Sequence, residues 1–193
     1  MNLTAKEVFP GLDAQISASR FNRVSRAIDS LFGKSLTRHQ NGSPFIITGD
    51  IPAMWLRDST WQVAPLLNSM HSEVIQLLIE LSKTQVELFL IDPYANAFNP
   101  APNGQCWHKD FPDQSPWVFE RKFELDSLAA VLDLAIRLYL ESGFTDHFTE
   151  RFNKAVVVIL DLLEREQNHD PGTFRFIRED VRDYDFLSHD GYG

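Results

Sequence analysis

Cysteine is almost absent from this sequence, because Cys106 is the only one among 193 residues. A single thiol excludes an internal disulfide and a cysteine-based zinc cluster, and it favours a reducing, cytoplasmic setting. The six histidines are scattered without the spacing of a zinc motif, and neither a glycine-rich phosphate loop nor a Gly-x-Ser-x-Gly elbow occurs. We therefore expect no metal and no cofactor.

Basic residues and long apolar runs are also scarce. The chain has 18 Lys and Arg against 27 Asp and Glu, a formal net charge of -9, which opposes binding to the phosphates of nucleic acids. The sequence contains neither an uninterrupted apolar stretch of about 18 residues nor the apolar core of a signal peptide. It therefore predicts no nucleic-acid partner, no membrane association and no export.

Aromatic residues, by contrast, are plentiful: 15 Phe, 4 Trp and 4 Tyr make up 12% of the chain. Several stand among polar residues, which suits a wet concave site where ring faces stack on the C–H faces of sugars or on other flat ligands. The alternative is that these rings simply fill the core. Composition alone leaves both interpretations open.

Helical periodicity dominates the hydrophobic pattern. Apolar spacing predicts one helix over 12–33 that ends at Gly33, a second from 58 or 59 to 67 and a third over 74–88. A fourth over 128–139 ends at Gly143, and a fifth over 148–163 is capped by Thr145. Short strands are expected near 45–48 and 173–177. Together these features predict an all-α fold of paired helices, with 1–193 as a single domain.

The segment 92–119 interrupts this helical pattern. It mixes prolines and Gly104 with aromatic residues, which is too broken a composition for a regular element. Its aromatic residues argue against disorder, since disordered segments contain few of them. We expect an ordered loop over a functional site.

A first polar cluster lies at 48–59, just before a predicted helix. Here Arg57 and Asp58 follow Trp55, and a guanidinium fork, a carboxylate and a ring face together match the hydroxyls and the C–H face of a pyranose. The alternative is structural, because Asp58 and Ser59 could cap the helix that follows.

A second polar cluster, at 119–127, also precedes a predicted helix and contains Glu124 and Asp126. Their carboxylates could bind substrate hydroxyls or orient a neighbouring group. The alternative is again helix capping, because the helix dipole favours acidic residues in the first turn. Two carboxylates this close in sequence are not taken as a catalytic pair, since an acid and a base must flank the scissile bond.

Three runs of sequence, TGDIPAMWLRDST at 48–60, DPYANAFN at 92–99 and ERKFELDSL at 120–128, resemble glycoside hydrolase family 125. The resemblance implies an inverting exo-α-1,6-mannosidase with an (α/α)6 barrel of paired helices, acting on mannose-containing oligosaccharides. It also implies that residues of these runs bind the terminal mannose. The implied substrate-binding residues are Asp50, Trp55, Arg57, Asp58, Tyr94, Glu124 and Asp126.

The resemblance covers nearly the whole chain but only about the first half of the family's usual length. The family's general acid, an aspartate in a later motif, and its general base, a glutamate near the far end, have no counterpart in these residues. We therefore expect a truncated chain that supplies binding groups but not proton transfer. An incomplete barrel should also expose apolar helix faces that could support self-association. The alternative is a non-catalytic helical interaction or glycan-binding module.

Overall fold

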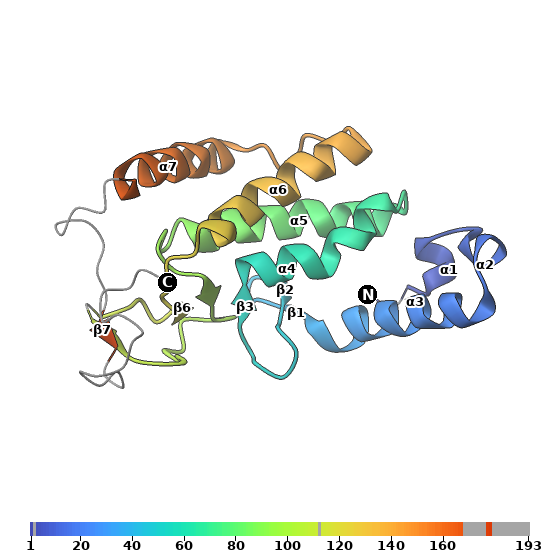
Figure 1. Ribbon diagram of the computed structural model, residues 1–193, viewed down its shortest axis with the longest axis horizontal. Coiled ribbons are helices and arrows are strands. Elements are labelled where there is room, and N and C mark those ends of the chain that lie inside the picture. Colours follow the sequence, from blue (N-terminus) through green and yellow to red (C-terminus); the bar gives the residue numbers. More distant parts are fainter. Residues whose placement is uncertain (2, 112, 168–176, 179–193) are drawn as a thin grey trace.

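The computed structural model describes residues 1, 3–111, 113–167 and 177–178, and most of these residues lie in helices. Figure 1 shows α4, α5 and α6 side by side, with α7 above them; α3 runs below α4 and its continuation, and α1 and α2 lie at the right end of the view. The α-helices are α1 Ala5–Val8, α2 Leu12–Gln15, α3 Ala18–Ser30, α4 Leu56–Val63, α5 Ser72–Phe89, α6 Leu125–Ser142 and α7 Glu150–Glu166.

The core is built around α5. This helix packs against β2, α6, α7 and the 3₁₀ turn Ala64–Asn68 that follows α4. Because neighbours surround α5, most of its residues are buried, including Leu78 and Leu81. Phe45 and Ile46, from β2 (Pro44–Ile46), are completely buried beside it. Removing such side chains typically costs about 2–5 kcal/mol, so this layer fixes the positions of the helices around it.

The prediction of one helix over 12–33 is wrong in two respects: the helix is interrupted, and it does not end at Gly33. It is divided at Ile16, whose backbone is extended, and α3 begins after Ser17, whose Oγ accepts a hydrogen bond from the backbone N–H of Arg20 at 3.4 Å. Apolar periodicity does not reveal such an internal cap. At the other end Gly33 does not stop the helix, because the chain continues through a π-helical turn over Leu31–Ser35.

Two other helix starts also differ from expectation. α4 begins at Leu56, before the predicted 58 or 59, and after Val63 it tightens into a 3₁₀ turn over Ala64–Asn68, where a proline removes one backbone donor. α7 is capped by Thr149, not Thr145: the Thr149 Oγ1 accepts the backbone N–H of Phe152 at 3.2 Å. The predicted stop of α6 at Gly143 is confirmed, with φ at 75°.

The segment 92–119 is ordered, as expected. The prediction that it contains no regular element is wrong, because it contains short strands. It contributes β4 (Ala97–Phe98) and the start of β6 (Val118–Glu120), and both join β3 (Met54–Trp55) in an antiparallel sheet of order β3-β4-β6. A further strand, β5 (Asp110–Phe111), pairs with β7 (Ile177–Arg178). The predicted strand over 173–177 lies outside the described residues except at its last position.

The strand predicted near 45–48 appears as β2, which pairs antiparallel with β1 (Leu36–Arg38). The turn between them contains Gly42 in the left-handed region, with φ at 84°. Asn41 supports this turn, since its Oδ1 accepts the backbone N–H and the Oγ–H of Ser43 at 3.0 and 2.7 Å. The β1–β2 hairpin therefore has a defined turn and lies beside α5.

The expected exposure of apolar helix faces is confirmed within the described residues. A row at helical spacing runs along one side of α6, and its Leu140 is 70% exposed. We call this row the apolar stripe of α6: Leu125, Ala129, Leu132, Ile136 and Leu140. Val157 and Leu160 of α7 and Trp61 of α4 are also exposed. None of the described helices combines the length and apolarity needed to cross a bilayer.

Candidate functional site

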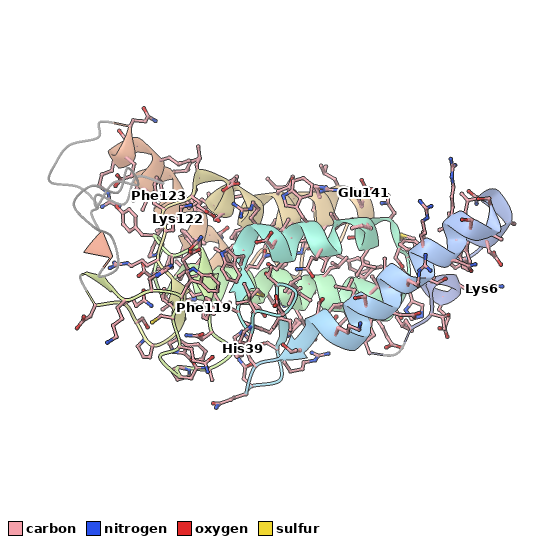
Figure 2. The ribbon with its side chains drawn as sticks, turned by 60° about the horizontal axis from the view of Figure 1, so that its bottom comes forward. Lys6, His39, Phe119, Lys122, Phe123 and Glu141 are labelled. Atoms are coloured by element: carbon pink, nitrogen blue, oxygen red, sulfur yellow. The ribbon has the colours of Figure 1, made fainter. Side chains whose placement is uncertain are left out.

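The small sheet brings the three motif runs of the sequence to one place. β3 leads directly into α4, β6 leads into α6, and β4 lies between the two strands. Backbone hydrogen bonds tie the junction, from Leu56 N to Asn96 O at 3.0 Å and from Asn96 N to Glu120 O at 3.3 Å. In Figure 2 the side chains of Phe119 and Lys122 lie toward this end of the molecule, with Glu141 toward the other. The N-termini of α4 and α6 are therefore neighbours.

Arg57 is the centre of a charged group that spans these two helix starts. Its Nη1 donates to Glu124 Oε2 at 3.0 Å and to Asp126 Oδ2 at 3.1 Å, and its Nη2 lies 3.8 Å from Asp58 Oδ2. Lys122 Nζ is 3.5 Å from Glu124 Oε1. We call Arg57, Asp58, Lys122, Glu124 and Asp126 the Arg57 cluster. With three carboxylates against two cations it carries a net charge of about -1 at neutral pH.

The guanidinium of Arg57 is well suited to stay charged and fixed. Partial burial disfavours its charge, but the hydrogen bond with Asp126 and the charges of Glu124, Asp126 and Asp58 raise its pKa above the ordinary value. Its side chain is 32% exposed, whereas that of Glu124 is only 15% exposed. Ser127 Oγ also donates to Glu124 Oε2 at 3.1 Å. The cluster therefore presents fixed donors and acceptors at a partly open surface.

The side chain of Trp55, two residues before Arg57, is also held by hydrogen bonding. Trp55 Nε1 donates to Glu120 Oε2 at 3.1 Å, and Asn96 Nδ2 donates to the same oxygen at 2.7 Å. The ring of Phe119 meets the ring of Trp55 edge to face, with centroids 5.6 Å apart. We call Trp55, Asn96, Phe119 and Glu120 the Trp55 shelf. Its indole is half-buried and has a fixed orientation.

N-capping does not explain Asp58 or Ser59, because both follow the N-cap position of α4. The N-cap position of α4 is Trp55 and that of α6 is Glu124, and neither side chain makes a capping hydrogen bond. Ser59 is buried inside α4, where its Oγ donates to Leu56 O at 3.0 Å. Asp126 does lie in the first turn of α6, so its dipole role and its contact with Arg57 coexist. Asp58 and Ser59 therefore do not cap α4, whereas Glu124 and Asp126 stand at the N-cap position and in the first turn of α6, as the capping alternative predicted.

The structure does not join Asp50 or Tyr94 to the Arg57 cluster by any hydrogen bond or ion pair among the described residues. Asp50 is exposed in a tight turn, which the Ile51 N to Thr48 O bond closes at 3.1 Å. Tyr94 donates through its hydroxyl to Glu166 Oε1 at 2.7 Å and packs on the ring of Phe123. Burial, together with this hydrogen bond, raises the pKa of Tyr94 to about 12. Substrate binding by these two residues stays a prediction.

Glu120 and Asn96 belong to the site but sequence reasoning did not single them out. Both lie inside the recognised runs, so the signal was present. What was missing was the strand pairing that places Ala97 opposite Glu120 and Trp55 opposite Ala97. Among the described residues no group of three or more His, Cys, Asp or Glu side chains is arranged to hold a metal ion.

Glu124 Oε2 and Asp126 Oδ2 both contact Arg57 Nη1, at 3.0 and 3.1 Å, so they lie closer together than the two carboxyl groups of an inverting enzyme. An acid and a base must stand on opposite sides of the scissile bond, and in inverting enzymes they are about 6.5–9.5 Å apart. Asp58, Glu124 and Asp126 instead converge on one guanidinium. Their geometry favours binding of hydroxyl groups.

Comparison with known proteins identifies the family of this chain. The family description "Metal-independent alpha-mannosidase (GH125)" matches residues 13–193, and the chain belongs to this glycoside hydrolase family. It is 33% identical over 177 residues to the meiotically up-regulated gene 157 protein of Schizosaccharomyces pombe. The matched region covers 86% of this chain and 35% of that protein.

A solved structure of a family member from Streptococcus pneumoniae, in a non-productive complex with α-1,6-mannobiose, is also similar. It superposes with a TM-score of 0.86 and 37% sequence identity, covering 100% of this chain and 47% of that one. The chain therefore spans about a third of its curated relative and about half of the solved structure.

Proposed function

We propose that this chain provides the wall that binds the terminal mannose in an inverting exo-α-1,6-mannosidase with an (α/α)6 barrel. The observation that supports the proposal is the Arg57 cluster, which joins the starts of α4 and α6 beside the Trp55 shelf. Family membership and the similarity to a structure that holds α-1,6-mannobiose support the choice of substrate class.

The chemistry of the two groups suits a pyranose. The Trp55 ring offers a flat apolar face for the C–H face of the sugar. The guanidinium of Arg57 donates to hydroxyl oxygens, and the carboxylates of Asp58, Glu124 and Asp126 accept from hydroxyl hydrogens. Such contacts accelerate a reaction when they tighten on the distorted ring of the transition state.

In this proposal, proton transfer belongs to other residues. One carboxylic acid protonates the glycosidic oxygen while a carboxylate on the opposite face activates water, which inverts the anomeric centre. We assign both groups to the part of the family's length that this chain does not cover. The described residues then bind and orient the sugar without exchanging a proton with it.

Calorimetric titration with α-1,6-mannobiose tests the proposal directly. We expect the chain to bind the disaccharide and Arg57→Ala to raise the Kd about tenfold, because a charge-assisted hydrogen bond is lost. Glu141→Ala, an exposed carboxylate toward the far end of α6, is the matched control and should bind as the wild type does. Equal affinities of Arg57→Ala and the wild type would refute the assignment.

Hydrolysis is measured on the same samples. We expect no turnover of α-1,6-mannobiose by the isolated chain. Robust turnover would require an acid and a base among the residues present, and Asp50, Asp58, Glu124 and Asp126 would then have to be tested one by one.

The apolar stripe of α6 favours a second candidate, a helical interaction module. The stripe exposes Leu125, Ile136 and Leu140, and exposed apolar patches on a helix face often mark an interaction surface. Sedimentation velocity over a concentration series tests it, with Leu140→Glu as the disrupting variant. A monodisperse monomer at every concentration would remove self-association from consideration.

A further inference from the structure

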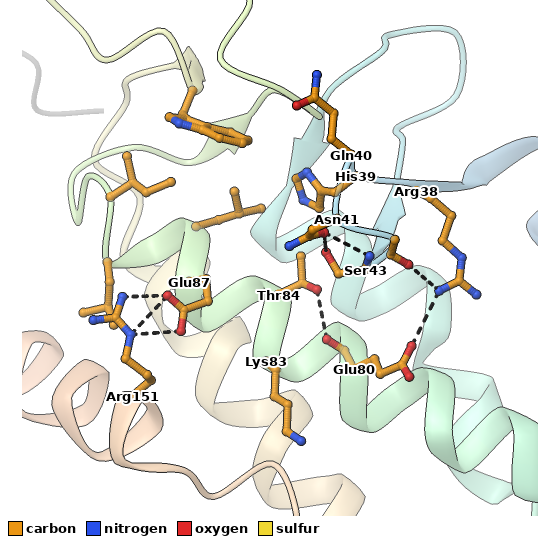
Figure 3. Close-up of a pocket in the computed structure, with 15 residues that line it drawn as sticks. Arg38, His39, Gln40, Asn41, Ser43, Glu80, Lys83, Thr84, Glu87 and Arg151 are labelled. Carbon is orange, nitrogen blue, oxygen red and sulfur yellow. Dashed lines mark hydrogen bonds and ion pairs between the residues drawn. The ribbon is translucent and has the colours of Figure 1, made fainter.

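A groove of about 970 Å³ lies on a different part of the surface from the Arg57 cluster, between the β1–β2 hairpin and α5. None of its lining residues belongs to the Arg57 cluster or to the Trp55 shelf. Figure 3 shows its two sides: Arg38 and Glu80 on one, Glu87 and Arg151 on the other, with His39 and Asn41 between them. We call it the outer groove. Its apolar lining comes from Leu88, Leu90, Ile91 and Trp117.

Five charged side chains line the outer groove; four of them form two pairs, and the fifth, Lys83, makes no ion pair among the described residues. Arg151 Nη2 and Glu87 Oε2 are 2.6 Å apart in a forked contact, and Arg38 Nη1 lies 3.5 Å from Glu80 Oε2. Each pair largely cancels its own charge, so the net charge of the lining comes from Lys83, and the paired groups offer hydrogen-bond donors and acceptors. Such a lining, rich in hydrogen-bond donors and acceptors, suits a hydroxyl-rich ligand.

His39 adds an acceptor with a defined direction. Its Nδ1 lies 2.7 Å from the carbonyl oxygen of Pro100, so this nitrogen carries the proton and Nε2 is the acceptor. Burial lowers the pKa of His39, which keeps the ring neutral. Nε2 makes no hydrogen bond within the described part of the chain, although the residue is only 9% exposed. A hydroxyl donor from a ligand fits this position.

An aromatic ring completes the set of groups. The ring of Trp117 lies 6.0 Å from the ring of His39, and the indole is half-buried in the groove lining. On the hairpin, Asn41 uses its Oδ1 for Ser43, while its Nδ2 makes no hydrogen bond among the described residues. A ring face, a neutral acceptor and an amide donor thus line one groove.

From this combination we infer that the outer groove is a second saccharide-binding site, separate from the mannose wall. A neutral sugar ring packs against Trp117, and its hydroxyls reach His39 Nε2, Asn41 Nδ2 and the paired charges of Glu87 and Arg151. The inference rests on the lining of the groove itself and does not depend on the proposed function.

Fluorine NMR of the chain labelled with 5-fluorotryptophan tests this inference, because its 4 Trp give separate signals. The signals are assigned with Trp117→Phe and Trp55→Phe. The probes are α-1,6-mannobiose, maltose and cellobiose, titrated into the millimolar range typical of weak sites. We expect the Trp117 signal to shift saturably with at least one of them.

Glu87→Ala and Glu141→Ala provide the matched pair of variants. Both remove an exposed carboxylate from a helix, but only Glu87 lines the groove. We expect Glu87→Ala to raise the Kd reported by Trp117 about fivefold and to leave the Trp55 response unchanged, with no effect of Glu141→Ala.

Other outcomes overturn one proposal or the other. A Trp117 signal that ignores all three disaccharides overturns the second site, whatever Trp55 does. A Trp55 signal that ignores α-1,6-mannobiose while Trp117 responds contradicts the mannose wall and supports the groove. A Trp117 response to a pool of unstructured decapeptides, without a response to the disaccharides, would identify the groove as a peptide site and overturn the saccharide assignment.

Discussion

Two arginines of this protein make carboxylate contacts of similar length in very different surroundings. Arg57 bonds Glu124 and Asp126 at 3.0 and 3.1 Å across the starts of α4 and α6; its side chain is 32% exposed, that of Glu124 15% and that of Asp126 60%. Arg151 donates to the carboxylate of Glu87 at 2.6 to 3.1 Å, but both side chains are about half exposed, at 48% and 53%. Short distances therefore do not rank the two contacts, because water screens the second one more strongly.

The comparison also separates two uses of an ion pair. In the Arg57 cluster one cation is shared by carboxylates on either side, so losing it leaves those carboxylates facing each other. In the Arg151–Glu87 pair each partner returns to water when the other is removed. We expect a large effect for the first and a small one for the second.

The largest effect is expected for Arg57→Ala. We expect the free energy of unfolding to fall by about 2 kcal/mol, because charge-assisted hydrogen bonds are lost and Glu124 and Asp126 repel each other. Urea unfolding followed by circular dichroism measures the change. Arg57→Lys, which keeps the charge without the fork, should lose less. A free energy of unfolding equal to that of the wild type would show that the cluster does not tie α4 to α6.

The next effect is expected for Glu120→Ala in the Trp55 shelf. It removes the acceptor shared by Trp55 Nε1 and the buried Asn96 Nδ2, so stability should fall by about 1.5 kcal/mol. The same urea experiment measures this, and the indole N–H signal of Trp55 reports the lost bond. Glu120→Gln keeps an acceptor oxygen and is the control. An unmoved Trp55 signal in Glu120→Ala would contradict the positioning role.

Part of this arrangement could be predicted from the sequence. The long helices α5 and α6 were predictable because apolar spacing marks both of them and Gly143 marks the end of α6. Arg57, Asp58, Trp55, Glu124 and Asp126 were predictable as candidates because they stand in recognisable runs next to helix starts.

The contacts themselves were not predictable. Trp55, Ala97 and Glu120 meet through strands of only two or three residues, too short to show an alternating pattern. The π-helical turn after α3 and the cap at Ser17 are decided by packing and by one hydroxyl, which periodicity does not record. The role of Tyr94 depends on Glu166, which is 72 residues away in sequence.

A third, intermediate effect is expected for Tyr94→Phe. It removes the hydroxyl that donates to Glu166, a carboxylate only 6% exposed whose other oxygen has no hydrogen bond within the described residues. We expect a loss of about 1 kcal/mol at neutral pH, measured by thermal or urea unfolding.

The pH dependence of this variant has a definite sign. The pKa of Tyr94 rises from 10.0 to about 12 on folding, so the folded state holds the proton more tightly. The contribution is complete below pH 10 and is lost as the pH rises toward 12. The stability difference between the wild type and Tyr94→Phe should therefore shrink over that interval. A difference that stays constant or grows would contradict the raised pKa.

The smallest effect is expected for Arg151→Ala, in the more exposed of the two ion pairs compared above. Despite the forked contact at 2.6 Å, we expect only a small loss of stability, because both partners are hydrated when separated and ordering two long side chains costs entropy. Unfolding in low and in high salt measures it, and the loss should shrink further when salt screens the pair. A loss equal to that of Arg57→Ala would show that contact geometry outweighs burial in this protein.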